Sequence, residues 1–244
     1  MMDGIGKEFI EGTKYKHLGP SDQMQGRTPP PLESPCEVSE TIVLPKARNI
    51  QFRDMSLRDA VERRRSVRRY TKEPVSLEGL AFLLWCTQGV QSQDPPYSTL
   101  RTVPSAGARH ALETYLLIHR VEGLEPGLYR YLAMAHRLAL LDSSEKISPS
   151  IVAGCLGQGI VATSAVTFLW TAVPYRMAWR YGERAYRYLH LDAGHACQNL
   201  YLSAEAVGCG VCAIAAFDDD AMNRCLGLDG TEQFVIYCAA LGKK

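Results

Sequence analysis

The segment with the clearest chemical potential is a dense basic run early in the chain. It reads RRRSVRR over residues 63–69 and places five arginines among seven residues. Like charges at helical spacing repel one another, and a bound phosphate would relieve that repulsion. A guanidinium donates two parallel charge-assisted hydrogen bonds to phosphate oxygens, and Ser66 adds a hydroxyl donor. The run therefore indicates a phosphate site, with a solvated basic face as the alternative.

Two segments of small residues could bring the backbone close to a flat ligand. The first, PSAGA at 104–108, has the composition of a turn between two elements. The second, GCGVCAIAAFD at 208–218, leads into a predicted helix start at Asp218. Exposed backbone N–H groups there could donate to the edge of a polar ring. An ordinary turn and a tightly packed core strand are the respective alternatives.

The remaining reactive side chains form no recognisable site. Cys209 and Cys212 have C-x-x-C spacing but lie in a predicted strand, whereas a redox thiol is activated at a helix amino terminus. No second pair completes a zinc site, and His190 and His195 diverge on a helix because they are five residues apart. Phosphate-loop and dinucleotide fingerprints are absent. We therefore expect no metal, no ATP and no Rossmann-bound dinucleotide.

The elements that must position these segments follow from periodicity and helix caps. Ser56 and Ser76 are spaced as N-caps for helices over about 56–64 and 77–90. The longest predicted helix covers 183–207, and Gly208 is its expected stop. Two further helices are expected at 145–157 and from 218, and strands at 113–120, 127–132, 137–141, 165–173, 210–216 and 233–241. Since helices and strands intermix without regular βαβ alternation, the fold class is α+β around one mixed sheet.

Composition narrows the class of protein. Lys and Arg number 27 against 26 Asp and Glu, a net charge of +1 that argues against a dedicated nucleic-acid binder. No apolar run reaches the roughly 18 residues needed to span a bilayer, and we expect no signal peptide. Eight cysteines scattered in apolar runs suit a reduced, cytoplasmic protein. The proline-rich residues 1–50 predict an extended arm or a partly mobile tail, and 51–244 the folded domain.

Taken in order, the basic segment RRSVRRY, the turn PSAGA and the late segment GVCAIAAFDDD resemble the flavin-dependent nitroreductase superfamily. The closer resemblance is to its SagB-type branch, the thiazoline and oxazoline dehydrogenases. It extends over about residues 55–242, and EGTKY at 11–15 is also similar. The resemblance implies a nitroreductase-like α+β fold, with a central, mostly antiparallel mixed sheet surrounded by helices. It also implies FMN bound at the interface of a homodimer.

The resemblance implies a flavin site shared by two subunits. The phosphate and ribityl side is implied to be held by Arg64, the backbone of Arg65, Ser66, Arg68 and Lys243. The turn that approaches the flavin from the partner comprises Pro104, Ser105, Ala106 and Ala108. The ring itself is implied to meet Gln158 at its pyrimidine end and the backbone of Ile214, Ala215 and Ala216 near N5 and O4.

One position departs from the azoline dehydrogenases. The resemblance implies a Lys-Tyr pair that helps to remove a proton, but this chain has Arg180 and Tyr181 there. Arginine stays protonated in proteins, so Arg180 cannot be a general base, although it could orient an anionic substrate. Tyr181 could exchange a proton if its pKa were lowered. Alternatively, both side chains simply pack or pair with Glu183.

These features support three hypotheses. The first is an FMN-dependent oxidoreductase that transfers hydride between flavin and a small organic or azoline-type peptide substrate. The second is a nitro or quinone reductase of the same fold that takes electrons from NAD(P)H. The third is a non-catalytic flavin-binding or docking subunit, because a fold alone does not determine an activity.

Overall fold

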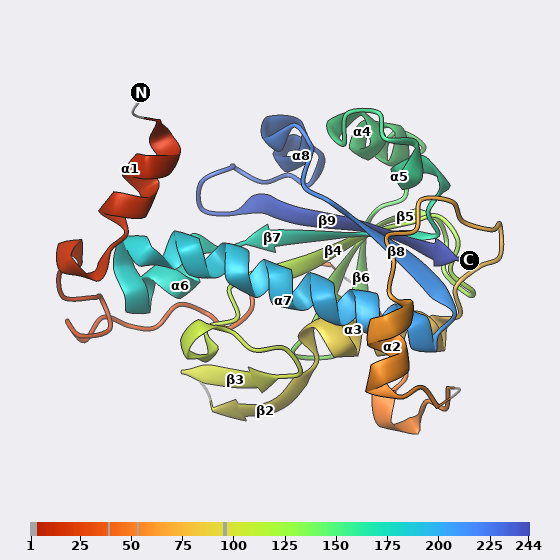
Figure 1. The fold of residues 1–244 in the computed structure, drawn as a ribbon, viewed down its shortest axis with the longest axis horizontal. Helices are drawn as coiled ribbons and strands as arrows, with labels where there is room; N and C mark the ends of the chain where they lie inside the picture. Colours follow the sequence, from red (N-terminus) through yellow and green to blue (C-terminus); the bar gives the residue numbers. More distant parts are fainter. Residues whose placement is uncertain (1–3, 39, 53, 95–96) are drawn as a thin grey trace.

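A computed structural model describes residues 4–38, 40–52, 54–94 and 97–244. Its main feature is a seven-stranded sheet in the order β1-β6-β5-β4-β7-β9-β8, with every neighbouring pair antiparallel (Figure 1). The strands are β1 (Thr41–Val43), β4 (Leu112–Ile118), β5 (Gly127–Leu132), β6 (Arg137–Asp142), β7 (Val166–Ala172), β8 (Cys209–Ile214) and β9 (Phe234–Lys243). A separate hairpin pairs β2 (Val90–Asp94) with β3 (Ser98–Arg101). The α+β fold class is confirmed.

Helices cover both faces of the sheet. They are α1 (Ile5–Gly12), α2 (Leu57–Arg63), α3 (Leu77–Gln88), α4 (Ile147–Gly154), α5 (Gly159–Thr163), α6 (Pro174–Tyr181), α7 (Ala185–Ala206) and α8 (Asp219–Cys225). Short 3-10 turns are η1 (Tyr15–His17), η2 (Ala47–Asn49), η3 (Ala106–Ala108) and η4 (Gly182–Arg184). Within the described ranges, no helix is long and apolar enough to cross a bilayer.

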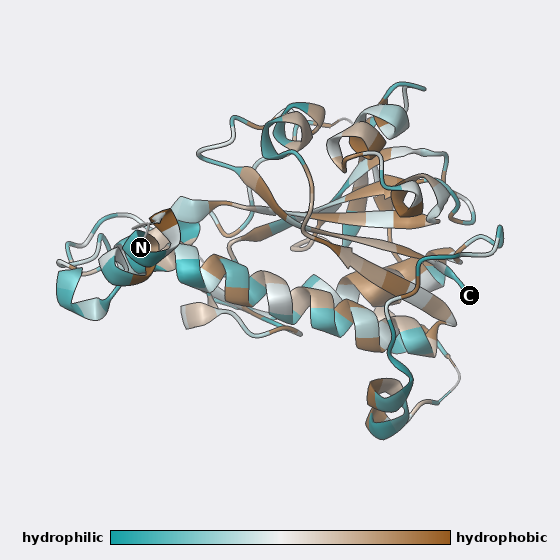
Figure 2. Cartoon of the chain, turned by 45° about the horizontal axis from the view of Figure 1, so that its top comes forward, coloured by the Kyte–Doolittle hydropathy of each residue, from teal (hydrophilic) through white to brown (hydrophobic). Residues whose placement is uncertain are grey.

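The central strand β7 shows why the sheet needs helices on both sides. Successive side chains of a strand point to opposite faces. Phe168 and Trp170 join the core under α3, α6 and α7, whereas Leu169 joins a second core under α4, α5 and α8. All seven residues of the strand are buried. Figure 2 shows mostly apolar strands between helices that mix hydrophobic and hydrophilic residues.

Three predicted helix starts are confirmed by their caps. Ser56 Oγ accepts from the Asp59 N–H at 3.0 Å and Ser76 Oγ from the Gly79 N–H at 3.1 Å. Asp218 Oδ1 accepts from the Ala221 N–H at 2.8 Å. Each cap satisfies an N–H group that has no partner within its helix.

The helix predicted over 145–157 is wrong in extent. It ends at Gly154, and α5 begins only at Gly159. Leu156 and Gly157 between them have positive φ angles of 56° and 69°, a conformation that cannot continue a right-handed helix. The break turns the chain so that Gln158 precedes α5. The strand predicted over 210–216 similarly ends at Ile214.

The proline-rich arm has more structure than its composition predicts. It contains α1 and η1, and its strand β1 extends the sheet by pairing with β6. Further along the arm, the Gln23 N–H donates to the Trp179 carbonyl at 2.8 Å. Figure 1 places α1 and η1 at the end of the molecule where α6 lies. The division between arm and domain at residue 50 stays a prediction.

Candidate functional site

The basic segment lies against the edge strand β8. Ser66 pairs with Val211 in a parallel bridge, and the Val67 N–H donates to the Val211 carbonyl at 2.9 Å. Gly210 makes this approach possible, because a Cβ there would lie only 2.5 Å from the Val67 Cβ. Backbone pairing to a strand therefore holds the segment in one register.

Tyr201 of α7 joins this segment to the end of β8. Its hydroxyl lies 3.0 Å from Ser66 Oγ and accepts from the Ala213 N–H at 2.9 Å. The Arg64 guanidinium stands over its ring, 5.4 Å from the centroid. Sequence reasoning missed Tyr201. It lies in the helix predicted over 183–207, but no spacing rule distinguishes it from the other tyrosines there.

The other predicted phosphate ligands differ in how they are engaged. The Arg65 guanidinium donates to the carbonyls of Glu62 and Arg64, at 3.1 and 2.7 Å. Arg68 is exposed. Lys243 Nζ donates to the Val207 carbonyl at 2.8 Å, beside the same edge of the sheet. Among the predicted phosphate ligands, one short segment therefore carries three side-chain donors, those of Arg64, Ser66 and Arg68.

Gln158 lies beside the exposed backbone that follows β8. Its Nε2 donates to the carbonyls of Ala216 and Cys155, at 2.7 and 3.0 Å. Ile214 is buried at the strand end, whereas Ala215 and Ala216 are exposed. We call Arg64, Ser66, Arg68, Tyr201, Gln158 and residues 214–216 the strand-edge cluster.

The turn at residues 104–108, predicted to face the partner subunit, contacts α7 at Asp192 rather than at Tyr201. Ser105 Oγ donates to Asp192 Oδ2 at 2.5 Å, and the Ala106 N–H donates to Asp192 Oδ1 at 3.3 Å. Burial raises the pKa of Asp192, and these hydrogen bonds only partly oppose it. Pro104 is exposed, and Ala108 has a positive φ of 54°. The buried carboxylate therefore fixes the turn on the helix.

The turn also touches the predicted catalytic pair. A Cβ on Gly107 would lie 2.5 Å from Tyr181 Oη and 3.0 Å from Arg180 Cδ. Gly107 has a φ of 58°, so both its backbone conformation and its surroundings require glycine. None of the ion pairs formed within residues 4–38, 40–52, 54–94 and 97–244 includes Arg180 or Glu183. We call residues 104–108 with Arg180 and Tyr181 the turn cluster.

The two clusters lie on opposite sides of α7. Asp192 and Tyr201 are nine residues apart, which corresponds to about 14 Å along the axis and half a rotation around it. One chain therefore does not bring Ser105 to Arg64. In the parts of the chain that the structure describes, no three His, Cys, Asp or Glu side chains lie close enough to hold a metal.

The sequence profile of the nitroreductase family matches residues 61–243, about three quarters of the chain. The chain belongs to the nitroreductase family. It is 31% identical over 192 residues to a protein of Methanocaldococcus jannaschii described as a nitroreductase, covering 78% of this chain and 92% of that protein. It is also 34% identical over 115 residues to the trifolitoxin-processing protein TfxB of Rhizobium leguminosarum bv. trifolii, covering 44% of this chain and 30% of TfxB.

Solved structures are also similar to this chain in fold. A structure from Anabaena variabilis described as a nitroreductase has a TM-score of 0.64 and 32% identity over 77% of this chain, which spans 38% of that longer chain. The E. coli microcin synthetase McbBCD complex with truncated pro-MccB17 bound has a TM-score of 0.60 and 20% identity, covering 98% of this chain and 92% of the matched one. The NADPH:FMN oxidoreductase of Vibrio harveyi has a TM-score of 0.55 and 14% identity, covering 77% and 68%.

The strand-edge cluster fits the cofactor that nitroreductase-family members generally bind, FMN. Two guanidiniums and a hydroxyl suit a phosphate dianion. Gly210 lets the segment that carries them pack closely on β8, and Ala215 and Ala216 are exposed beyond the end of that strand. The donor chemistry therefore matches a phosphate dianion next to a flat ring.

Proposed function

We propose that this chain is a homodimeric FMN-dependent oxidoreductase of the SagB-type branch. It would act on a small organic or azoline-type peptide substrate. The observation that carries the proposal is the contact chain from Arg64 and Ser66 through Tyr201 to the Ala213 N–H. It supports the proposal because Arg64 and Ser66, the predicted phosphate ligands, lie beside the end of β8. Bound FMN would supply the hydride chemistry, and the protein would orient it.

The arrangement of α7 supports a shared site. Its buried side carries Leu189, Ala193, Ala196 and Leu200, whereas Leu191 is 58% exposed and His195 is exposed. A second copy packed on the exposed side of α7 would cover Leu191. It could also bring its own turn cluster to the strand-edge cluster of the first copy. Flavin contacts from two chains would then link dimerisation to cofactor binding.

The branch assignment has two supports beyond the sequence motifs. TfxB, a toxin-processing protein, is similar over 115 residues, and a chain of the McbBCD synthetase has the same fold over 98% of this chain. The eight cysteines are free, which suits a cytoplasmic enzyme.

The spectrum of the purified protein tests the proposal. We expect flavin absorbance at about one FMN per chain, and loss of most of it in the double variant Arg64→Gln/Arg68→Gln. Arg58→Gln/Arg48→Gln is the matched control, since both of its arginines are exposed and lie outside the cluster. A colourless protein that takes up no added FMN would refute the proposal.

Arg180 favours a second candidate, an NAD(P)H-dependent nitro or quinone reductase. An arginine cannot remove the proton that azoline oxidation releases, and Tyr181 alone remains for that role. Anaerobic NADPH should bleach the flavin of a reductase. An azoline peptide should lose two hydrogens with a dehydrogenase, and flavin that responds to neither would indicate the docking subunit.

A further inference from the structure

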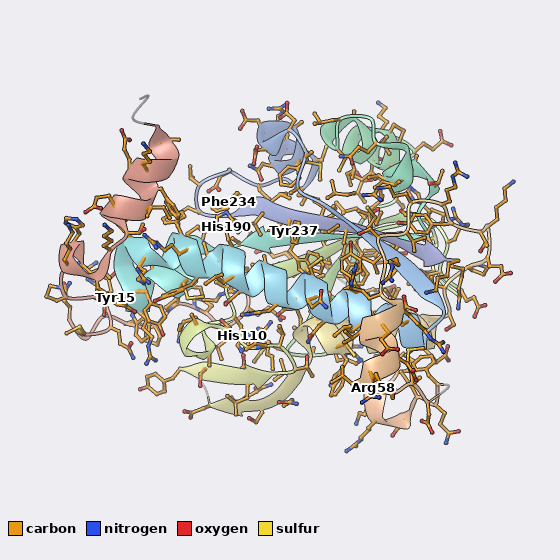
Figure 3. All side chains as sticks on the ribbon, in the orientation of Figure 1. Tyr15, Arg58, His110, His190, Phe234 and Tyr237 are labelled. Carbon is orange, nitrogen blue, oxygen red and sulfur yellow. The ribbon has the colours of Figure 1, made fainter. Side chains whose placement is uncertain are left out.

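The arm and the predicted catalytic pair enclose a cleft. It has a volume of about 390 Å³, and its walls are arm residues 15–24 on one side and Arg180 and Tyr181 on the other. Figure 3 shows Tyr15 at this end of the molecule, away from Arg58 on α2. We call this space the arm cleft. Its Arg180–Tyr181 wall belongs to the turn cluster, since Gly107 packs directly on both side chains.

Among the described residues that line this cleft, Arg180 is the charged one. The turn at Gly107 holds its stem, and its guanidinium carbon lies 5.7 Å from the centroid of the Tyr181 ring. Two carboxylates of the nearby arm are already engaged. Glu11 pairs with Lys14 and Lys16, and Asp22 accepts from Tyr175 and pairs with Arg27. Arg180 has no ion-pair partner within the described ranges, so its donors remain for a ligand.

The opposite wall is apolar and accessible. Met24 is 77% exposed and Tyr15 is 64% exposed, and Leu18 lines the cleft with them. Exposed large apolar side chains that line a concavity gain free energy when a ligand covers them. A cation opposite an apolar wall matches an anionic group carried on an apolar or flat body.

The wall is held in place by polar contacts to α6 and α7. Tyr15 Oη lies 2.8 Å from Tyr188 Oη, and the Arg184 guanidinium stands 4.3 Å from the Tyr15 ring centroid. Arg184 also donates to the Thr13 carbonyl at 2.9 Å, and Trp179 Nε1 to the Arg27 carbonyl at 3.0 Å. The arm is therefore positioned over Arg180 before any ligand arrives.

We propose that the arm cleft is a substrate subsite that binds a carboxylate-bearing group, with Arg180 holding the anion and the arm residues 15–24 covering its apolar body. Its role as a substrate subsite rests on the proposed function. Binding of the anion itself can be measured whether or not the protein carries flavin.

Fluorine NMR titration of the full-length protein, as purified, tests the subsite with 4-fluorobenzoate and its neutral analogue 4-fluorobenzamide. We expect the benzoate to bind about tenfold more tightly, because a hydrogen bond to a charged partner is worth a factor of this order. Arg180→Gln should remove that preference without changing benzamide affinity. Met24→Ser should weaken both probes about threefold, because it removes apolar wall rather than charge.

Two matched controls locate the effect. Arg58→Gln removes an exposed arginine at the other end of the molecule, and Leu100→Ser removes a side chain that is 57% exposed on β3. Equal affinities of the two probes, or equal effects of Arg58→Gln and Arg180→Gln, would overturn the proposal. A colourless protein that still shows the Arg180-dependent preference would refute the flavin function alone. A yellow protein without that preference would refute the subsite alone.

Discussion

The basic segment and the arm are attached to the same core by different kinds of contact. The segment pairs its backbone with β8, as in the 2.9 Å hydrogen bond from the Val67 N–H to the Val211 carbonyl. The part of the arm that precedes β1 is held mainly by side chains. These include Arg184, Trp179 and the Tyr15–Tyr188 pair. Backbone pairing sets a register that few substitutions can change, whereas side-chain attachments can be lost one at a time. The phosphate side should therefore be the rigid half of the site and the arm cleft the adjustable half.

The deepest attachment of the arm should have the largest effect when it is broken. Glu113 is fully buried, accepts from the Ser34 N–H at 2.7 Å, and pairs with Arg176 at 2.8 Å and Arg130 at 3.2 Å. Burial opposes its ionisation, but the two guanidiniums outweigh that effect and lower the pKa of the carboxyl. Glu113→Gln would leave both cations uncompensated and should cost about 3–5 kcal/mol in the free energy of unfolding.

Urea denaturation measures this loss. Glu145→Gln changes an exposed carboxylate and should leave the unfolding midpoint nearly unchanged. A loss below about 1 kcal/mol in Glu113→Gln would show that the buried triad is not what secures Ser34 to the sheet.

Gly210→Ala tests the rigid half. The new methyl group would clash with Val67, so the basic segment must move off β8 or the strand must shift. We expect a loss of about 1–3 kcal/mol in unfolding free energy, together with a marked loss of bound FMN. Gly6→Ala is the control, since a Cβ there meets nothing within 4 Å. Unchanged flavin retention in Gly210→Ala would mean that close packing on β8 is not needed for the cofactor.

Burial of His110, two residues after the 104–108 turn, should make the stability depend on pH. Burial lowers the pKa of its imidazole from 6.5 to about 3, and its side chain is 5% exposed. The unfolded chain gains a proton below about pH 6.5 and the folded chain does not, so stability is full above that pH and falls as the pH drops toward 3. Between pH 7 and pH 5 the unmodified protein should lose about 1–2 kcal/mol more than His110→Asn does.

Asparagine suits this substitution because His110 has a φ of 44° and asparagine tolerates positive φ. Chemical denaturation of both proteins at the two pH values gives the difference. Parallel pH profiles for the two would rule out His110 as the origin.

The adjustable half should show the smallest effect. Tyr15→Phe removes one exposed phenol-to-phenol contact and should speed trypsin cleavage at Lys14 and Lys16 about two- to fivefold. Tyr97→Phe, at a side chain that is 57% exposed, is the control. Identical cleavage rates for the two variants would show that the Tyr188 contact does not hold the arm.

The sequence predicted the rigid half better than the adjustable half, for a physical reason. Caps at Ser56, Ser76 and Asp218 act over three residues, so their spacing shows in the chain and all three are confirmed. The basic segment was likewise visible as a run of charges. Tyr201 and Asp192 were missed because their partners are about 90 to 135 residues away, and only the tertiary fold brings them together.

The arm was the least predictable region. Its proline-rich composition indicated an extended arm or a partly mobile tail, and composition carries no information about long-range acceptors. The contact between Tyr15 and Tyr188 spans 173 residues. The roles of the strand-edge and turn clusters in binding flavin stay predictions, although contacts join Arg64 and Ser66 to Tyr201 and Gly107 to Arg180 and Tyr181.

The half rotation between Asp192 and Tyr201 along α7 has a consequence for how this protein could diverge. In the proposed homodimer, each site would draw one cluster from each chain, so a single chain would serve two sites through different sides of one helix. After a gene duplication, one copy could lose Arg64 and the other Ser105, and their mixed dimer would still keep one complete site. The same helix that makes the two sites equivalent in a homodimer would allow a pair of unequal subunits to divide them.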